Sequence, residues 1–161
     1  MNIFYLNEDP RVAAEEHCDK HVCKMTIEYC QLLSTAHRAL DGAEYYDKTK
    51  NGRRIKRWLL PDERESGLML GIMLNHPSTI WTRQCAENYD YLLELWVNLC
   101  YEFEYRYGKN QLNEEDERLI NTAELIASAH IGQNTVDSTQ SPTSDYLFFQ
   151  IWDANGQLLT R

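Results

Sequence analysis

Six polar residues of the stretch HCDKHVCKMTIEYCQLLST, residues 17–35, have a spacing that could form a binding site. At about 100° per residue in a helix, they fall within about 40° of a common line. They are His17, His21, Lys24, Glu28, Gln31 and Thr35. The opposite side carries apolar residues such as Val22 and Leu32, which predict a core stripe. A solvated face, or one that pairs with a second polar line on residues 83–98, is the alternative to a ligand site.

The residue types of this line favour a phosphate-bearing ligand over a metal ion. Two histidines four residues apart can chelate one metal, and Glu28 could add a carboxylate. However, Lys24 lies between them on the same line, and an ammonium is unfavourable beside a divalent cation. We therefore expect no metal and no cofactor. For a nucleotide, Lys24 supplies a charge, protonated imidazoles supply donors, and Glu28 or Gln31 could read a base or sugar edge.

Two other segments could extend such a site. Arg54 and Trp58 belong to the most basic stretch of the chain. The rings of Trp58, Tyr45 and Tyr46 could stack on a base there. The sequence His76-Pro77-Ser78 opens a helix whose free backbone N–H groups favour an anion. Arg83 lies on the polar line of that helix, whereas His37 and Arg38 read as an ordinary surface or helix-end pair. No motif marks a catalytic residue, so whether the protein is an enzyme stays open.

The elements that must position these residues begin with a long helix. Asp9 is a good N-cap and Pro10 suits the first helical position, and the apolar period runs to Leu40. Such a helix is longer than usual, so the sequence allows a break near residues 16–20. Asn51-Gly52 predicts a hairpin over residues 44–60 with a type I′ turn. Residues 62–74 predict a short helix.

The rest of the chain predicts further helices. Pro77 opens a second long helix over residues 78–107, which Gly108 ends. A third helix is expected over 114–130, a polar loop over 132–145 and a terminal hairpin over 146–161. The expected fold class is therefore mainly α: a single domain, residues 1–161, formed as a small helical bundle with two long helices and a β-hairpin insertion.

Composition restricts the partners. The 161 residues have a net charge of −9, but residues 1–60 carry ten Lys/Arg against nine Asp/Glu. Residues 61–161 carry six against sixteen, so duplex DNA is an unfavourable partner. No apolar run approaches the ~20 residues of a membrane span. Five cysteines without a CxxC pair are typical of reduced thiols in a cytoplasmic compartment.

Several segments together resemble a family of small proteins, of no settled activity, encoded by tailed bacteriophages, notably of marine bacteria. These segments are MNIFYLNEDP, HCDKHVCKM, QLLSTAHR, GRRIKRW, NHPSTIW and YRYGK, within residues 1 to about 110. The resemblance implies a phage protein that acts in the cytoplasm of a bacterial host. The chain beyond residue 110 departs from the pattern.

A second resemblance is to the endonuclease V type of pyrimidine-dimer DNA glycosylase. Those enzymes are small, helical and phage-borne, with a histidine-bearing first helix and a later helix that opens at a proline. Their nucleophile is the amine of a small second residue after removal of Met, whereas Asn2 follows Met1 here. Their catalytic glutamate aligns with Lys24. The lyase chemistry therefore does not carry over, and the resemblance implies only an inherited nucleotide-binding fold.

The function expected from the sequence is binding, with or without cleavage or modification, of a phosphate-bearing nucleotide in a pocket between the two long helices. Sequestration of a host immune nucleotide signal would be one such counter-defence role. Two alternatives are a DNA-base glycosidase or related base-modifying enzyme, and an acidic protein that inhibits a host protein. The sequence leaves a homo-oligomer open.

Overall fold

Residues 2–108 are described in the computed structural model. The third helix, polar loop and terminal hairpin expected over residues 114–161 lie outside this range. Residues 2–8 run extended without pairing as a strand, and Phe4 donates its backbone N–H to the Tyr29 hydroxyl at 3.1 Å. The lead-in is therefore anchored on the long second helix.

The first expected helix is divided in two. The Asp9 carboxylate accepts the backbone N–H groups of Arg11 and Val12 at 2.9 and 3.5 Å, and helix α1 spans Pro10–Glu16. The backbone is extended at His17 and Cys18, after which α2 spans Asp19–Asp41. The break that the sequence allowed is present. Consequently His17 is not on the helical line that Lys24 and Glu28 share.

The core lies where α1 and α2 meet α5, which spans Ala86–Tyr107. Apolar side chains of α2 and α5 fill this interface, so the contact between the two long helices is a packed one. The largest of them are Met25, Tyr29, Leu32, Leu33, Leu92, Leu95, Trp96 and Leu99. The Trp96 indole N–H also donates to the Thr26 carbonyl at 2.7 Å. Gly108 ends α5 with a left-handed φ of 58°.

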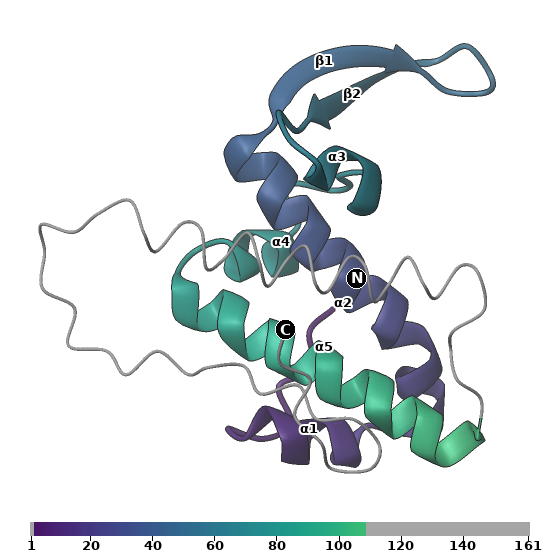
Figure 1. The fold of residues 1–161 in the computed structure, drawn as a ribbon, viewed down its shortest axis with the longest axis vertical. Coiled ribbons are helices and arrows are strands. Elements are labelled where there is room, and N and C mark those ends of the chain that lie inside the picture. The colour runs from purple at the N-terminus through teal and green to yellow at the C-terminus, as the bar shows by residue number, and fades with distance from the viewer. Residues whose placement is uncertain (1, 109–161) are drawn as a thin grey trace, which may run out of the picture.

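A β-hairpin projects at the far end of α2, opposite α1 (Figure 1). Strand β1, Ala43–Lys48, pairs in antiparallel fashion with β2, Arg54–Leu59. Ala43 lies opposite Leu59 at one end of the pair, and Lys48 lies opposite Arg54 at the other. The hairpin expected over residues 44–60 is confirmed. Its turn differs: the Thr49 N–H donates to the Arg53 carbonyl at 2.9 Å, and only Gly52 has a positive φ, 74°. A three-residue loop with glycine in the left-handed position replaces the type I′ turn.

The segment between the hairpin and α5 is mostly irregular. Helix α3 covers only Arg64–Gly67, and residues 68–76 form no helix. The helix expected over 62–74 is therefore wrong, because the Arg38 side chain takes carbonyls that a helix would use internally. The helix expected over 78–107 is also divided, into α4, Pro77–Thr82, and α5. At the division Asn88 donates its side-chain N–H to the Trp81 carbonyl at 2.9 Å.

The expected fold class, a mainly α small helical bundle with two long helices and a β-hairpin insertion, is wrong, although the hairpin itself is present. Residues 2–108 contain five helices and a two-stranded antiparallel sheet, so the fold is mixed, although largely helical, with 58% of the residues in helices and 11% in strands. The expectation failed because local periodicity does not show where a distant side chain captures the backbone. Such capture ends α3 early and separates α4 from α5, while the hairpin projects from the end of α2.

Candidate functional site

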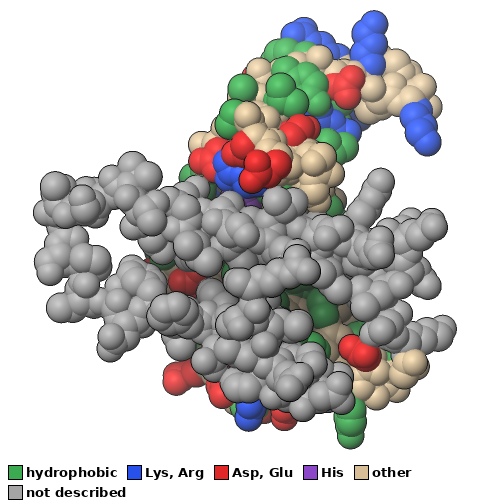
Figure 2. Space-filling view, in the orientation of Figure 1, with side chains coloured by type: hydrophobic (Ala, Val, Ile, Leu, Met, Phe, Trp, Pro, Cys, Tyr) green, Lys and Arg blue, Asp and Glu red, His purple; other side chains and the backbone are tan. Residues whose placement is uncertain are grey.

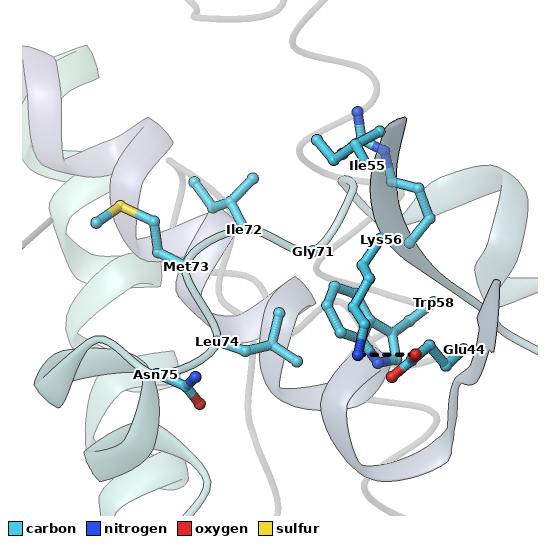
Figure 3. Close-up of a pocket in the computed structure, with 10 residues that line it drawn as sticks. Glu44, Ile55, Lys56, Trp58, Gly71, Ile72, Met73, Leu74 and Asn75 are labelled. Carbon is cyan, nitrogen blue, oxygen red and sulfur yellow. Dashed lines mark ion pairs between the residues drawn. The ribbon is translucent and has the colours of Figure 1, made fainter. Parts of the chain in front are cut away.

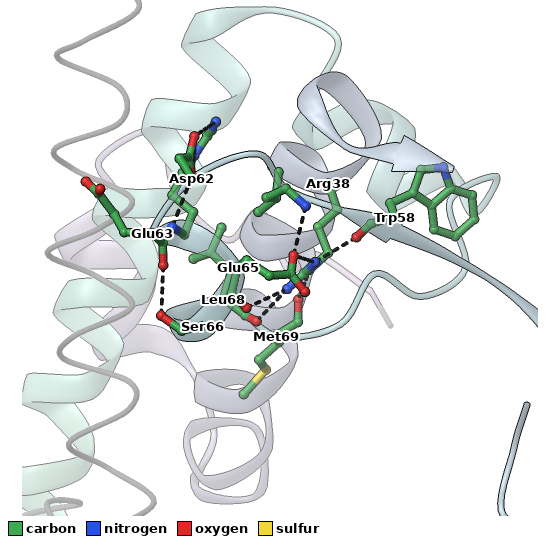
Figure 4. Close-up of polar contacts among 10 residues, drawn as sticks. Arg38, Trp58, Asp62, Glu63, Glu65, Ser66, Leu68 and Met69 are labelled. Atoms are coloured by element: carbon green, nitrogen blue, oxygen red, sulfur yellow. Dashed lines mark hydrogen bonds and ion pairs between the residues drawn. The ribbon is translucent and has the colours of Figure 1, made fainter. Parts of the chain in front are cut away.

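Arg38, near the end of α2, fixes the base of the hairpin (Figure 4). A guanidinium has five N–H groups, and this one makes five hydrogen bonds while its side chain is 1% exposed. The acceptors are the carbonyls of Trp58, Glu65, Leu68 and Met69 at 2.7, 3.3, 3.0 and 2.6 Å and the Glu65 carboxylate at 2.6 Å. One buried cation therefore joins α2, β2 and the segment after α3.

Glu65 closes this network by accepting the backbone N–H of Leu60 at 2.8 Å. His37, the neighbour of Arg38, is also buried and lies within 2.8 Å of the Tyr89 hydroxyl through Nε2. Arg64 donates to its Nδ1 at 3.1 Å and to the Asp41 carboxylate at 2.6 Å. Arg38 lies in the last turn of α2, as the helix-end alternative predicts, but the surface alternative is wrong for both residues, because partners far along the chain compensate their burial.

Gly42 allows the hairpin to lie close to the end of α2, whereas a side chain at Gly71 would make only ordinary contacts. A Cβ at Gly42 would stand 2.4 Å from the Arg38 carbonyl oxygen and 2.8 Å from the Trp58 Cβ. A Cβ at Gly71 would stand 3.6 Å from the Trp58 ring. Trp58 is therefore wedged between the helix end and residue 71.

A pocket of about 590 Å³ lies between β2 and the segment 71–75 (Figure 3). Among the described residues β2 pairs only with β1, so its outer edge is open to this pocket. The pocket is lined by Glu44, Ile55, Lys56, Arg57, Trp58, Gly71, Ile72, Met73, Leu74 and Asn75. It combines an aromatic ring, two cations, a carboxylate and an amide around a partly apolar wall.

The two cations of the pocket differ in their partners. Lys56 pairs with Glu44 at 2.8 Å, and this hydrogen bond raises the pKa of the exposed Lys56 amine. The Arg57 side chain makes no hydrogen bond or ion pair with the residues described, and its Nε is shielded from solvent. A shielded donor without an acceptor is unfavourable. An anionic oxygen in the pocket would supply what Arg57 lacks.

One wall of the pocket holds an unusual backbone. Met73 has a φ of 46°, the one positive value among the non-glycine residues described, and its side chain is exposed. The left-handed region costs a residue with a side chain on the order of 1–2 kcal/mol. Such strain is found most often where a site must be shaped.

The polar line expected on residues 17–35 does not form one continuous surface. His17 is 1% exposed, with Nδ1 at 2.6 Å from the Ala13 carbonyl and Nε2 at 3.0 Å from the Tyr29 hydroxyl. Both of its nitrogens are occupied, so its expected position on the polar face is wrong. His21 stacks on Phe4, with ring centroids 4.1 Å apart.

The later members of the line lie further along α2. Lys24 is exposed and pairs with Glu28 at 3.2 Å. Gln31 is half-buried, and its carbonyl accepts the Thr35 hydroxyl at 2.6 Å. The Thr35 oxygen in turn accepts the Ile72 N–H at 3.3 Å. The line therefore ends beneath the pocket wall, and none of its members lines the pocket.

The other candidates fall into two groups. Trp58 lines the pocket, and the Arg54 guanidinium lies 3.5 Å from the centroid of the Tyr46 ring on the hairpin. His76 caps α4 by accepting the Ser78 N–H at 3.2 Å, and Arg83 donates to the Thr79 carbonyl at 2.9 Å. His76, Ser78 and Arg83 thus make contacts within α4 and its caps, apart from the pocket lining.

Sequence reasoning missed several pocket residues. Lys56 and Arg57 lie in the basic stretch that was identified, so a signal for them existed. Gly71 and Asn75 had no such signal, because their place depends on Arg38 holding the preceding backbone. Within residues 2–108, no three His, Cys, Asp or Glu side chains come together as a metal site would require.

No helix in the described part of the chain has both the length and the apolar character needed to cross a membrane. Comparison of the sequence and the structure with protein-family models, curated proteins and solved structures gave no match.

Proposed function

We propose that the pocket beside β2 binds a phosphate-bearing nucleotide. In this proposal Trp58 stacks on the base, while Arg57 and Lys56 contact the phosphate. Glu44 and Asn75 are placed to hydrogen-bond the polar edges of the sugar or base. The site thus differs from the one expected between the long helices, whose interface is filled by apolar side chains.

The observation that carries the proposal is Arg57, a cation with a shielded Nε and no acceptor among the residues described, on the same pocket as an aromatic ring. Charge supports it. The hairpin, residues 43–59, carries six Lys/Arg and two Asp/Glu, whereas the body, residues 2–42 and 60–108, carries seven and fifteen. Figure 2 shows several blue side chains at the hairpin end. An anionic ligand is therefore attracted to the hairpin and repelled by the body.

The expected strength is modest. A stacked base contributes about 1–3 kcal/mol, and a charge-assisted hydrogen bond about 1.5–3 kcal/mol. After the entropic cost of association, this corresponds to a dissociation constant of roughly micromolar to millimolar. Binding alone is proposed, because Glu44 raises the pKa of the Lys56 amine and so keeps this potential nucleophile protonated. From the resemblance to phage proteins we infer that the binding occurs in the cytoplasm of an infected bacterium.

Calorimetric titration with dTMP, thymidine and inorganic phosphate as separate arms tests the proposal. We expect dTMP to bind more tightly than either part. Trp58→Ala should weaken the binding of dTMP and thymidine by about tenfold. Arg57→Ala should weaken the binding of dTMP and phosphate by about tenfold. Tyr105→Ala and Arg11→Ala remove an aromatic ring and an arginine from exposed positions of the body and serve as controls.

Two results would overturn the proposal. One is the absence of dTMP binding at millimolar concentration. The other is equal dTMP affinity in Arg57→Ala and Arg11→Ala, with melting curves showing that both variants are folded. In addition, mass spectrometry of small molecules released from protein expressed in a bacterium would identify the natural nucleotide.

A further inference from the structure

One face of the hairpin continues from the pocket toward the turn. The register pairs Glu44 with Trp58, Tyr46 with Lys56 and Lys48 with Arg54. Because side chains alternate between the two faces of a strand, these six lie on the same face. We call them the hairpin face: Glu44, Tyr46, Lys48, Arg54, Lys56 and Trp58. Its inner end, at Trp58 and Lys56, belongs to the pocket.

The outer half of the hairpin face is cationic and aromatic. Tyr46 is 52% exposed, with the Arg54 guanidinium 3.5 Å and the Lys56 ammonium 5.9 Å from its ring centroid. Within the described part of the chain, neither Lys48 nor Arg54 has an ion pair. These charges are therefore available to a partner, and Arg54 is held over a ring rather than over a carboxylate.

The two aromatic rings of the hairpin face have a spacing that suits successive bases. Tyr46 and Trp58 occupy diagonal positions of the antiparallel pair, which are roughly 7–8 Å apart. Six residues of a strand extend about 20 Å, which is room for about three nucleotides whose bases are spaced roughly 7–8 Å apart on successive rings. Rings for bases and cations for phosphates, repeated along a strand, are what sequence-tolerant single-strand binding uses.

We propose that the nucleotide in the pocket is one unit of a single-stranded nucleic acid, whose next units lie along the hairpin face. This inference rests on the proposed function and names its substrate class. Tyr46 stacks on the next base, while Arg54 and Lys48 contact the following phosphates. A duplex fits poorly, because its paired bases cannot reach the rings and the acidic body would repel its second strand.

The test compares one nucleotide with a strand. Binding of dTMP and of an eight-residue oligothymidylate is measured on the full chain by calorimetry and fluorescence anisotropy. At low salt we expect the oligonucleotide to bind at least about tenfold more tightly than dTMP. Three or four neutralised phosphates give a slope of the logarithm of affinity against the logarithm of salt concentration of about −2 to −3.

Variants separate the pocket from the hairpin face. Arg54→Ala and Tyr46→Leu should each weaken the oligonucleotide by about fivefold or more and leave dTMP unchanged. Arg54→Ala should also reduce the salt slope by about 0.7. Trp58→Ala should weaken both ligands. Lys20→Ala and Tyr105→Ala, at exposed positions of the body, are the matched controls and should alter neither affinity.

The outcomes distinguish the two proposals. If dTMP binds but the oligonucleotide binds no more tightly, the proposal of a single-stranded nucleic acid is refuted, while the proposed nucleotide site in the pocket is retained. If Arg54→Ala and Lys20→Ala lose oligonucleotide affinity equally, the hairpin face is also refuted. Inorganic polyphosphate that binds as tightly as the oligonucleotide would show that charge alone acts. Binding to anionic phospholipid vesicles that exceeds oligonucleotide binding and is lost in Arg54→Ala would assign the face to a membrane surface.

Discussion

The body and the hairpin are held in place by different forces. In the body, side chains of α1, α2 and α5 interlock in one apolar core. In the hairpin, every residue of β1 is exposed, and every residue of β2 is exposed or half-buried. The hairpin keeps its position because Arg38 holds the Trp58 carbonyl and Gly42 allows a close approach. Apolar packing tolerates small adjustments, whereas five hydrogen bonds to one guanidinium require a single geometry.

The strongest test of this comparison is a change in the core. Trp96→Ala should lower the free energy of unfolding by about 3–5 kcal/mol, because it opens a cavity and removes the hydrogen bond to Thr26. Denaturant unfolding followed by circular dichroism measures the loss. Hydrogen exchange should accelerate in both body and hairpin. A variant that loosens only the hairpin would contradict the assignment of the core.

Arg38→Met should have a smaller effect on the body and a larger one on the hairpin. It leaves several carbonyls and the Glu65 carboxylate without their donor, at a cost of about 2–4 kcal/mol. We expect hydrogen exchange to accelerate across residues 43–75, while the core amides of α5 change less. Dissociation of dTMP should become faster as well. Uniform acceleration in all helices would show that the hairpin and the body unfold together.

The smallest predicted effect concerns pH and the break between α1 and α2. Burial lowers the pKa of His17 below its usual 6.5, against the opposing effect of its hydrogen bond to Ala13. The unfolded chain therefore takes up a proton that the folded chain does not. Stability is complete above pH ~6.5 and falls as pH drops below it, by less than about 1.4 kcal/mol per pH unit.

The measurement is urea unfolding at pH 7.5 and 5.5. His17→Gln should show a weaker pH dependence than the natural chain, while Lys24→Ala, at an exposed position, should change stability by no more than about 0.5 kcal/mol. Equal pH dependence in the natural chain and in His17→Gln would mean that other groups account for it. Burial also raises the pKa of Tyr29 to about 12, so its hydroxyl stays protonated across this range and donates to His17.

The parts of the fold that sequence predicted depend on neighbouring residues. Asp9 and Pro10 start α1, and Asn51-Gly52 forms a hairpin, because caps and turns are decided within a few positions. The type of that turn was mispredicted, since Asn51 keeps a negative φ and the loop takes one more residue. Local chemistry thus determined that a turn forms, but not its geometry.

The candidate site was predicted only in part, because some of its residues are positioned by contacts that are distant in the sequence. Trp58 and Arg54 were found because basic and aromatic residues alternate in one short stretch. The wall at Gly71–Asn75 was not, because it is created by Arg38, which bonds residues 20 to 31 positions away. An arginine in a helical sequence looks the same whether it is solvated or surrounded by carbonyls. Its partners become visible only in three dimensions.

The open edge of β2 has a consequence for how copies of the chain behave toward one another. A two-stranded sheet presents unpaired N–H and C=O groups that invite a strand of a second molecule. Lysine and arginine beside such an edge discourage that pairing by mutual repulsion. In this protein Arg54, Lys56 and Arg57 stand along the strand that borders the pocket. The same positive charges would therefore protect the chain against edge-to-edge aggregation when it is crowded in solution.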